Sequence, residues 1–395
     1  MSARSVLLLG AGPLQVPAVE AARRLGLRTV VLDANPAAPG MALADLSVVA
    51  DIKDSETALE VARREQVSGV LSVCTDLAVR PVAHVARALG LPGVSPEAAA
   101  RATDKFQMRE AFARYGAPAP RARRVTSEDE LRDAAARLGF PVMVKPTDGV
   151  GSKGVTRVGR PGELDLAWRR AQAVSRNGQL VCEEYVEGPE VSVEGITWEG
   201  ETHLVAITDK LTSGPPYFVE TGHTEVSRLP EQAQAVILEA ARLGVEALGI
   251  DFAASHTEIK LGARGPRIME IGARLGGDRI TSDLVPLATG VDIFEAALRV
   301  ALGEPPDVAP RFARGAAIRY FLPEPGTVVS IEGERDSRAV EGVVGWVLDV
   351  GPGGPVPTLE SSQSRVGHVV TVGDTPDQAA ERAERARGLL TIRTR

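Results

Sequence analysis

Short apolar runs alternate with amphipathic segments over residues 4–95, and this alternation constrains the fold more than any other feature of the sequence. The apolar runs are SVLLLG, TVVLDA and GVLSVCT, and the segments with helical periodicity are LQVPAVEAARRLG, SETALEVARREQ and VRPVAHVARALG. Short apolar runs bounded by helices are typical of buried strands. Strands that alternate with helices form parallel βαβ units, so the alternation predicts an open α/β sheet.

The first predicted strand runs into the turn Gly10-Ala11-Gly12, and Asp33 ends the second predicted strand. This is the outline of a dinucleotide site, but such a site needs a third glycine three residues after the second, where the helix packs against its strand. Gln15 occupies that position. The turn is therefore weak support for a nicotinamide-dependent dehydrogenase.

Composition narrows the classes of partner. The 395 residues carry a net charge of −7, which argues against nucleic acid, because phosphate binding favours a basic surface. Cys74 and Cys182 lie in apolar runs and read as small buried hydrophobic residues, without disulfide or zinc-ligand spacing. No apolar run approaches the roughly 18 residues of a membrane span. We expect a cytoplasmic protein whose partners are small molecules, with no nucleic-acid or membrane partner.

The segment HTEIKLGARGPRIMEIGARLGGD predicts a β-hairpin with its turn centred near Arg264. Glu258 lies six residues before that centre and Glu270 six residues after it. In that register the two carboxylates face each other across the ladder, with Cβ atoms about 5 Å apart. Two opposed like charges are unfavourable, so a divalent cation such as magnesium is expected between them. The alternative is a slipped register in which both glutamates are solvated.

Alternation along this hairpin also predicts which side chains share a face. The face of the two carboxylates is predicted to carry Glu258, Lys260, Glu270 and Arg274. The opposite face is predicted to carry Ile259, Met269 and Ile271.

A glycine-rich loop follows the predicted strand that ends at Lys145, in VMVKPTDGVGSKGV. It is not a Walker A loop, because G-x-x-x-x-G-K-[ST] is absent. Backbone N–H groups of such a loop can still bind phosphate oxygens, and a lysine that ends a buried strand needs an anionic partner. The alternative is an ordinary surface turn. The loop residues singled out are Gly149, Gly151, Ser152 and Gly154, and Lys105 is a second candidate cation.

A predicted strand in LVCEEYVEGPEVSVEG leads into Glu183-Glu184-Tyr185-Val186, and Glu190 follows. Backbone groups after a strand can hydrogen-bond an adenine edge, and a later acid can hold ribose hydroxyls. By itself this segment is also compatible with any acidic strand exit.

Taken in order, these motifs resemble those of the ATP-grasp superfamily: VMVKP, a glycine-rich loop, EEYV with a later glutamate, and a carboxylate hairpin that ends in E-x-x-x-R. The resemblance covers most of the chain. It implies an α/β fold with a pre-ATP-grasp open parallel sheet in residues 1–97 and an ATP-grasp α+β domain pair in residues 98–312. Its small ATP-binding subdomain would span about residues 115–185, and a small strand-rich C-terminal domain of the biotin-carboxylase-like type would span residues 313–395. The glycine turn would then belong to a substrate-side domain.

The resemblance also implies a role for each matching residue. ATP phosphates would be bound by Lys105, Lys145 and the loop of Gly149, Gly151, Ser152 and Gly154. The adenine hinge would comprise Glu183, Glu184 and Val186, and the ribose would be held by Glu190. Magnesium, or manganese in its place, would be ligated by Glu258 and Glu270, and Arg274 would steady the transferring phosphoryl group or acyl phosphate. One departure stands out, because many members have Asn where this chain has Gly272.

The implied activity is that of a carboxylate–amine ligase that forms an acyl phosphate and releases ADP and phosphate. Within that group, the chain looks most like the L-amino acid ligases, which join amino acids. The long segment KLTSGPPYFVETGHTEVSRLP places His223 where it would stabilise an oxyanion or orient the acceptor; a structural role is the alternative. Further candidates for the substrate pocket are Glu220, Asp278 and Ser282. The alternative activity is that of a bicarbonate-phosphorylating carboxylase of the biotin-carboxylase or purine-pathway type, and a nucleotide sensor without turnover is less favoured. A homodimer is common in the family and is a possible assembly for this chain.

Overall fold

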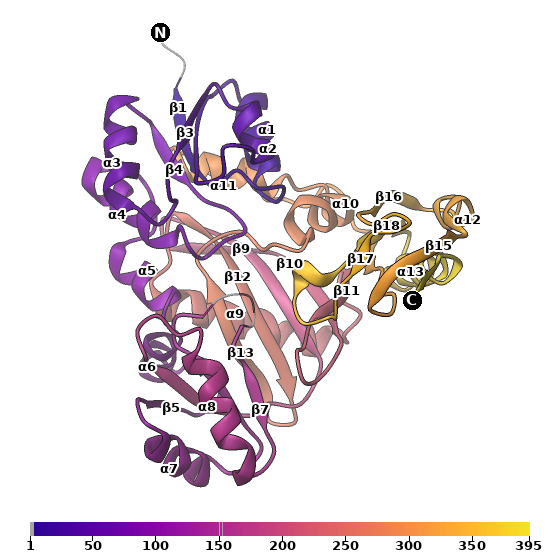
Figure 1. The fold of residues 1–395 in the computed structure, drawn as a ribbon. Helices are drawn as coiled ribbons and strands as arrows, with labels where there is room; N and C mark the ends of the chain where they lie inside the picture. Colours follow the sequence, from indigo (N-terminus) through magenta and orange to yellow (C-terminus); the bar gives the residue numbers. More distant parts are fainter. Residues whose placement is uncertain (1–3, 150, 152) are drawn as a thin grey trace.

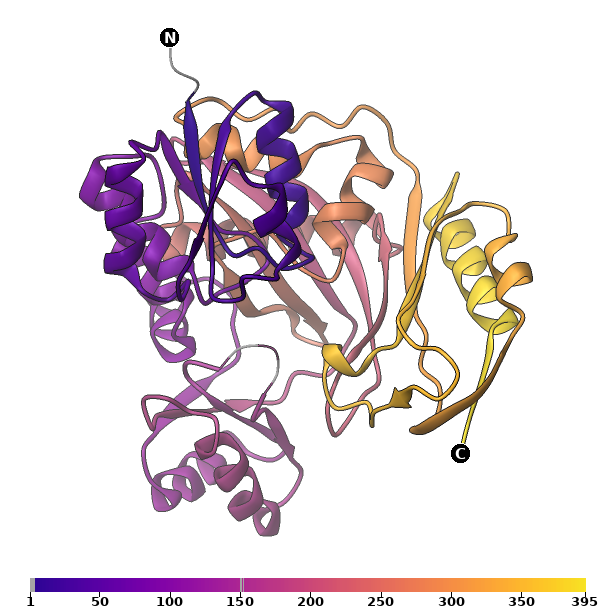
Figure 2. The same cartoon turned by 45° about the horizontal axis from the view of Figure 1, so that its top comes forward.

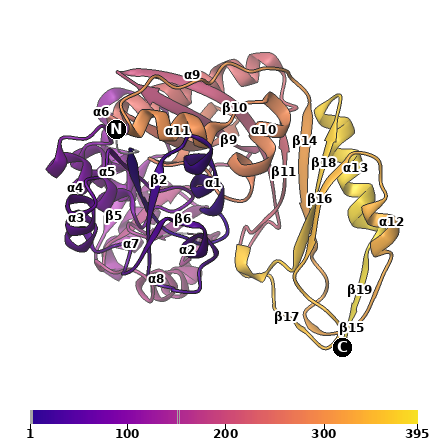
Figure 3. The same ribbon diagram turned by 90° about the horizontal axis from the view of Figure 1, so that it is seen from above.

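The computed structural model describes residues 4–149, 151 and 153–395, and Figures 1–3 show it from three directions. In Figure 1 the N-terminal sheet lies at the top, a small subdomain lies below it, and the C-terminal part lies to the right. A long antiparallel sheet runs between these parts.

The N-terminal sheet is parallel with strand order β3-β2-β1-β4, which confirms the predicted βαβ arrangement. Its strands are β1 (Ser5–Leu9), β2 (Arg28–Asp33), β3 (Leu46–Val49) and β4 (Gly69–Leu71). Its helices are α1 (Val16–Arg24), α2 (Pro39–Leu43), α3 (Ser55–Arg64) and α4 (Val79–Leu89). Helices α3 and α4 pack on one face, and α1 packs on the other beside α11 (Ile293–Ala301), which comes from much later in the chain.

Gln15 covers the glycine turn at the end of β1. Its Nε2 donates a hydrogen bond to the carbonyl of Val73 at 3.0 Å, and a Cβ on Gly12 would lie 2.8 Å from its Oε1. The backbone N–H of Ala11 donates to Asp33 at 2.8 Å, so this carboxylate is bound to its own turn. The space that a dinucleotide pyrophosphate needs next to the turn is therefore taken by a side chain.

The small subdomain is a four-stranded antiparallel sheet with order β5-β8-β6-β7. Helices α5 (Pro96–Ala102) and α6 (Lys105–Tyr115) lead into it. Its strands are β5 (Ala122–Val125), β6 (Val142–Pro146), β7 (Thr156–Val158) and β8 (Leu180–Glu184). A short 3-10 turn (Pro161–Glu163) precedes α8 (Leu164–Gln172), which packs with α7 (Glu128–Leu138) against the sheet through a cluster of buried aliphatic side chains.

The long sheet has eight strands in the order β13-β12-β9-β10-β11-β14-β18-β16, and every pairing in it is antiparallel. Its first five strands are β9 (Glu190–Trp198), β10 (Glu201–Thr212), β11 (Glu220–Glu225), β12 (Ala253–Gly262) and β13 (Gly265–Gly272). Helix α9 (Glu231–Leu248) and helix α6 cover one face, where Ile259, Ile268 and Ile271 are fully buried. The β9–β10 pair turns at Glu199-Gly200.

The C-terminal part continues the same sheet through β14 (Gly315–Tyr320), β16 (Val343–Leu348) and β18 (Gly367–Gly373). Strand β11 pairs with β14, so the sheet runs across the boundary expected near residue 313. A separate sheet joins β15 (Gly326–Glu332), β17 (Pro355–Val356) and β19 (Thr391–Thr394). The short helical segments here are a π-helical turn (Ile280–Leu284), α10 (Val285–Thr289), α12 (Glu334–Arg338) and a 3-10 turn (Ser362–Ser364). Helix α13 (Pro376–Leu389) packs on β14 and β18 (Figure 3).

Within the described part of the chain, no helix is both long enough and apolar enough to cross a bilayer.

Candidate active site

The β12–β13 hairpin places two carboxylates directly opposite each other. Glu258 pairs with Glu270 in the strand register, as the sequence predicts. The turn itself is tighter than predicted, because Gly262 pairs with Gly265 and only two residues lie between them. A β-bulge between Glu258 and Ile259 restores the match, so unequal strand lengths still bring the two glutamates together.

The bulge also moves one side chain to the other face. Glu258 pairs with Glu270 and Ile259 pairs with Ile268, which leaves Met269 as the extra residue of the bulge. Met269 lines the same cavity as the two carboxylates, so its predicted place on the opposite face is wrong. Ile259 and Ile271 lie on the opposite face, as predicted, and are fully buried there.

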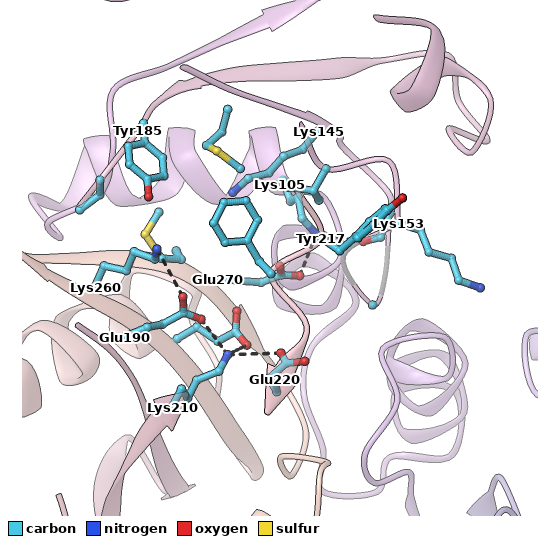
Figure 4. Close-up of a pocket in the computed structure, with 18 of the residues that line it drawn as sticks. Lys105, Lys145, Lys153, Tyr185, Glu190, Lys210, Tyr217, Glu220, Lys260 and Glu270 are labelled. Carbon is cyan, nitrogen blue, oxygen red and sulfur yellow. Dashed lines mark hydrogen bonds and ion pairs between the residues drawn. The ribbon is translucent and has the colours of Figure 1, made fainter. Parts of the chain in front are cut away.

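A cavity lined by five lysines lies between the small subdomain and the long sheet (Figure 4), and we call it the lysine cavity. The lysines are Lys105, Lys145, Lys153, Lys210 and Lys260. Apolar lining is supplied by Met143, Val155, Tyr185, Val186 and Met269. The wall also contains the loop glycines Gly149 and Gly151, the acids Glu190, Glu220, Glu258 and Glu270, and Pro146, Tyr217 and Phe218. A cavity that combines lysines with apolar side chains suits a nucleotide.

Lys210 and Lys105 balance the carboxylates of the hairpin. Lys210 Nζ lies 2.7 Å from Glu258, 2.8 Å from Glu190 and 3.7 Å from Glu220. Burial alone would lower the pKa of Lys210, but the three carboxylates hold this pKa well above its ordinary value. Lys105 Nζ lies 2.8 Å from Glu270, and this carboxylate raises the pKa of Lys105 against the opposing effect of burial.

The side chain of Glu183 lies away from the lysine cavity, which leaves its backbone for the adenine contact expected of it. Its side chain is fully buried and forms ion pairs with Lys145 and Arg109, each at 2.8 Å, so the carboxylate faces the core instead of an adenine. Burial would raise the pKa of Glu183, but the two cations lower it to about 2. Glu183 therefore holds Lys145 at the edge of the lysine cavity.

Two further hinge and loop residues also face away from that cavity. The carboxylate of Glu184 pairs with Arg121 at 2.9 Å and with Arg264 at 3.0 Å, and both arginines are largely exposed. Gly154 lies against α8, where a Cβ would come within 2.5 Å of Val174. Ser152 lies outside the described residues.

A second cavity shares Glu220, Glu258, Glu270 and Lys210 with the lysine cavity, and we call it the polar cavity. It extends from the hairpin toward the N-terminal sheet and is further lined by Leu14, Cys74, Asp76, His223, His256, Arg274, Asp278 and Ser362. Ser282 is not among its described lining residues; its hydroxyl donates to Asp283 at 2.5 Å.

Arg274 and His223 both lie in this polar cavity. The Arg274 guanidinium donates two hydrogen bonds to Asp76, at 2.9 and 3.0 Å, and this carboxylate raises the pKa of Arg274 despite burial. His223 is almost fully buried, and its Nε2 lies 3.4 Å from Asp278. His223 Nδ1 has no hydrogen-bond partner among the described residues.

Gly272, the departure from the usual Asn, has a physical reason. A Cβ at this position would lie 2.9 Å from Cζ of Arg274 and 2.9 Å from Oδ1 of Asp76. The Arg274–Asp76 ion pair therefore occupies the space into which a longer side chain would project. Gly272 itself offers no side-chain oxygen to a metal.

Several residues of the site were not predicted from the sequence. Lys210, Asp76, His256 and Glu194 all take part, and His256 Nδ1 lies 2.5 Å from Glu194. Glu194 raises the pKa of His256 to about 9, against the opposing effect of burial. Alternation along β9, with acids at positions 190 and 194 around Ser192, is a signal that could have found Glu194.

The donor set fits magnesium. No group of three or more His, Cys, Asp and Glu side chains capable of holding a metal occurs in residues 4–149, 151 and 153–395. Magnesium does not need such a group, because it is commonly bound by one or two carboxylates together with phosphate oxygens. Glu258 and Glu270 line the lysine cavity side by side with the cations expected to bind those phosphates.

Three domain families match successive parts of the chain. They are the ATP-grasp N-terminal domain over residues 19–93, the ATP-grasp domain over residues 138–282, and the L-amino acid ligase C-terminal domain 2 over residues 319–395. A formate-dependent phosphoribosylglycinamide formyltransferase from Burkholderia cenocepacia is 30% identical, over 98% of this chain and 94% of that protein.

Alanine–anticapsin ligase from Bacillus subtilis is 31% identical over 57% of this chain, and the match spans about half (52%) of that protein. The crystal structure of an L-amino acid ligase from Bacillus licheniformis superposes with a TM-score of 0.84 at 23% identity, over 99% of both chains, and so shares the fold. The chain belongs to the ATP-grasp superfamily of ADP-forming carbon–nitrogen ligases, in the carboxylate–amine ligase branch similar to L-amino acid ligases.

Proposed function

We propose that this protein joins two amino acids through an amide bond, using ATP and magnesium and releasing ADP and phosphate. The observation that carries the proposal is the position of Glu258 and Glu270, which lie in the wall shared by the lysine cavity and the polar cavity. A nucleotide in the first cavity would present its terminal phosphate to a carboxylate in the second. The L-amino acid ligase C-terminal domain and the alanine–anticapsin ligase relative support amino acids as the substrates.

The nucleotide roles follow the chemistry of the lysine cavity. Adenine would lie between Met143, Tyr185 and Val186, and Glu190 would accept hydrogen bonds from the ribose hydroxyls. Lys105 and Lys145 would contact the phosphates, together with N–H groups of the glycine-rich loop. Glu258 and Glu270 would hold magnesium, which supplies charge neutralisation at the phosphates when bound.

The reaction needs positioning and charge neutralisation more than acid–base residues. An oxygen of the substrate carboxylate attacks the γ-phosphorus, the bond to ADP breaks, and an acyl phosphate forms. The amine nitrogen then attacks the acyl carbon, and the phosphate leaves with the proton that the nitrogen loses. Arg274, held by Asp76 in the polar cavity, would stabilise the charge on the acyl phosphate. His223 would orient the acceptor or stabilise the oxyanion.

A second candidate is activation of a one-carbon acid, formate or bicarbonate, with a phosphoribosyl amine as acceptor. The phosphoribosylglycinamide formyltransferase relative favours it. The electrostatics of the polar cavity favour amino acids, because its cations Lys210 and Arg274 are already paired with carboxylates. In the polar cavity itself, a phosphate monoester would lie beside the carboxylates of Glu220, Glu258 and Glu270.

Release of ADP with a panel of single amino acids, amino-acid pairs, bicarbonate and formate tests the proposal, with mass spectrometry of the products. We expect release that depends on particular amino acids and a product with the mass of a dipeptide. Glu270→Gln should reduce turnover by about 100-fold or more, because it would weaken the binding of the magnesium that neutralises the phosphates. Glu184→Gln, whose side chain faces away from the cavity, serves as the matched control and should retain turnover. Release that depends only on bicarbonate or formate would contradict the proposal.

A further inference from the structure

The segment that follows the carboxylate hairpin has an unusual backbone. Asp278 and Arg279 both adopt positive φ angles, +53° and +61°, although neither is glycine. A π-helical turn, Ile280–Leu284, begins directly after them. Consecutive left-handed residues and π turns are costly and gather at functional sites. Their position between the polar cavity and the C-terminal part of the chain calls for a functional explanation.

Asp278 is fully engaged by the protein itself. Arg365, from the C-terminal part, donates two hydrogen bonds to the Asp278 carboxylate at 2.6 and 2.9 Å, and its guanidinium lies 3.7 Å from the centre of the Tyr320 ring. The Tyr320 hydroxyl donates to the backbone carbonyl of Asp278 at 3.1 Å. Asp278 and Arg365 therefore neutralise each other and fix the segment in place.

Arg279 contributes to a different cavity from the two described above. It lines a third cavity, the outer cavity, together with Tyr320, Asp349 and His368. The outer cavity shares Leu14, Asp278 and Ser362 with the polar cavity, so the two adjoin. A substrate that reaches Glu258 and Glu270 from this side would extend into the outer cavity.

Arg279 is paired less closely with carboxylates than Lys210, Arg274 and Arg365 are. Lys210, Arg274 and Arg365 each form close ion pairs with carboxylates, at 2.6 to 2.9 Å. The one carboxylate within ion-pair distance of Arg279 among the described residues is Asp283, at 3.4 Å, which is longer than a charge-assisted hydrogen bond.

His368 also lines the outer cavity, close to its two arginines. Burial, together with the nearby Arg279 and Arg365, lowers the pKa of His368 to about 4. His368 is therefore neutral at pH 7, so the charged side chains that line the outer cavity are Arg279, Arg365, Asp278 and Asp349.

We propose that Arg279 binds the α-carboxylate of the amine substrate and so makes a free amino acid, instead of a simple amine or an amide, the preferred acceptor. The inference rests on the proposed function. The carboxylate that is activated must lie beside Glu258, Glu270 and Arg274, so a second carboxylate in the outer cavity belongs to the other substrate. A guanidinium suits it, because its planar donors match both carboxylate oxygens.

Kinetics with an acceptor amino acid and its carboxamide test the assignment. We expect Arg279→Met to raise the KM of the free acid by about 10- to 100-fold, as the loss of a charge-assisted pair implies. The KM values for ATP and for the activated amino acid should stay within about twofold. The preference for acid over amide in kcat/KM should fall toward one, and Arg279→Lys should restore part of it.

Arg299→Met is the matched control, because Arg299 on α11 is similarly exposed and also pairs with a carboxylate four residues away. It should leave the preference unchanged, and melting temperatures confirm that all variants fold. An unchanged preference in a folded, active Arg279→Met enzyme overturns the inference while the ligase function stands. Absence of any amino-acid-dependent turnover in the wild type overturns the proposed function and, with it, this inference.

Discussion

Glu183 is fully buried between two cations, and its replacement offers a quantitative test of the structure. The pKa of this carboxyl falls from its ordinary 4.5 to about 2, because Arg109 and Lys145 outweigh the effect of burial. A shift of that size corresponds to about 3 kcal/mol, at 1.36 kcal/mol for each pKa unit. Glu183→Gln keeps the shape of the side chain and removes the charge, so we expect the free energy of unfolding at pH 7 to fall by about 3 kcal/mol.

The expected change in melting temperature follows from the length of the chain. At about 2.1 cal/mol/K of unfolding entropy for each of the 395 residues, 3 kcal/mol corresponds to a decrease of roughly 4 °C. Because the folded pKa of Glu183 is depressed, its stabilisation is present above pH 4.5 and is lost as the pH falls toward 2. The difference between wild type and variant should therefore shrink over this interval.

Glu184→Gln is the control next to it in the sequence. Its partners Arg121 and Arg264 are 60% and 70% exposed, and pairs with exposed arginines contribute at most about 1 kcal/mol. Thermal unfolding followed by circular dichroism at pH 7 and at pH 3 measures both variants. Equal melting temperatures for Glu183→Gln and wild type at pH 7 would refute the buried ion-pair assignment.

Two other substitutions test the electrostatics of the site and the core. Lys210→Met removes the cation between Glu190 and Glu258, so we expect added magnesium to raise the melting temperature of the variant more than that of the wild type. Thermal unfolding in a magnesium titration measures both responses, and equal responses would contradict this expectation. Burial raises the pKa of Glu225 to about 8, so its contribution to stability is present below pH 4.5 and is lost as the pH rises through 8. Glu225→Gln should therefore be more stable than the wild type at pH 9, by about 3–5 kcal/mol, and urea unfolding that shows no gain there would count against the buried position.

The sequence predicted the hairpin carboxylates well because local strand geometry determines their pairing. Their near-equal spacing about the turn survived an unforeseen bulge, and Glu258 and Glu270 face each other. Met269 was misplaced by that same bulge, since one extra residue reverses the alternation after it. The parallel N-terminal sheet was likewise predictable from local periodicity.

Contacts between distant segments could not be predicted from local patterns. Lys210 on β10 meets carboxylates from β9, β11 and β12, and only the order of strands in the sheet brings them together. Glu183 resembled a hinge residue, but the pairing of β6 with β8 places it beside Lys145. The continuation of the sheet into the C-terminal part depends on the same kind of long-range pairing, between β11 and β14.

Transfer of an oxygen isotope tests the central claim, phosphorylation of a substrate carboxylate, most directly. The activated amino acid is labelled with ¹⁸O in its carboxylate, and the phosphate released on amide formation is analysed by mass spectrometry. An acyl phosphate intermediate predicts one ¹⁸O atom in phosphate for each amide formed, because the carboxylate oxygen that attacks phosphorus leaves with it. Phosphate without the label, released as ATP is consumed and amide forms, would contradict the account.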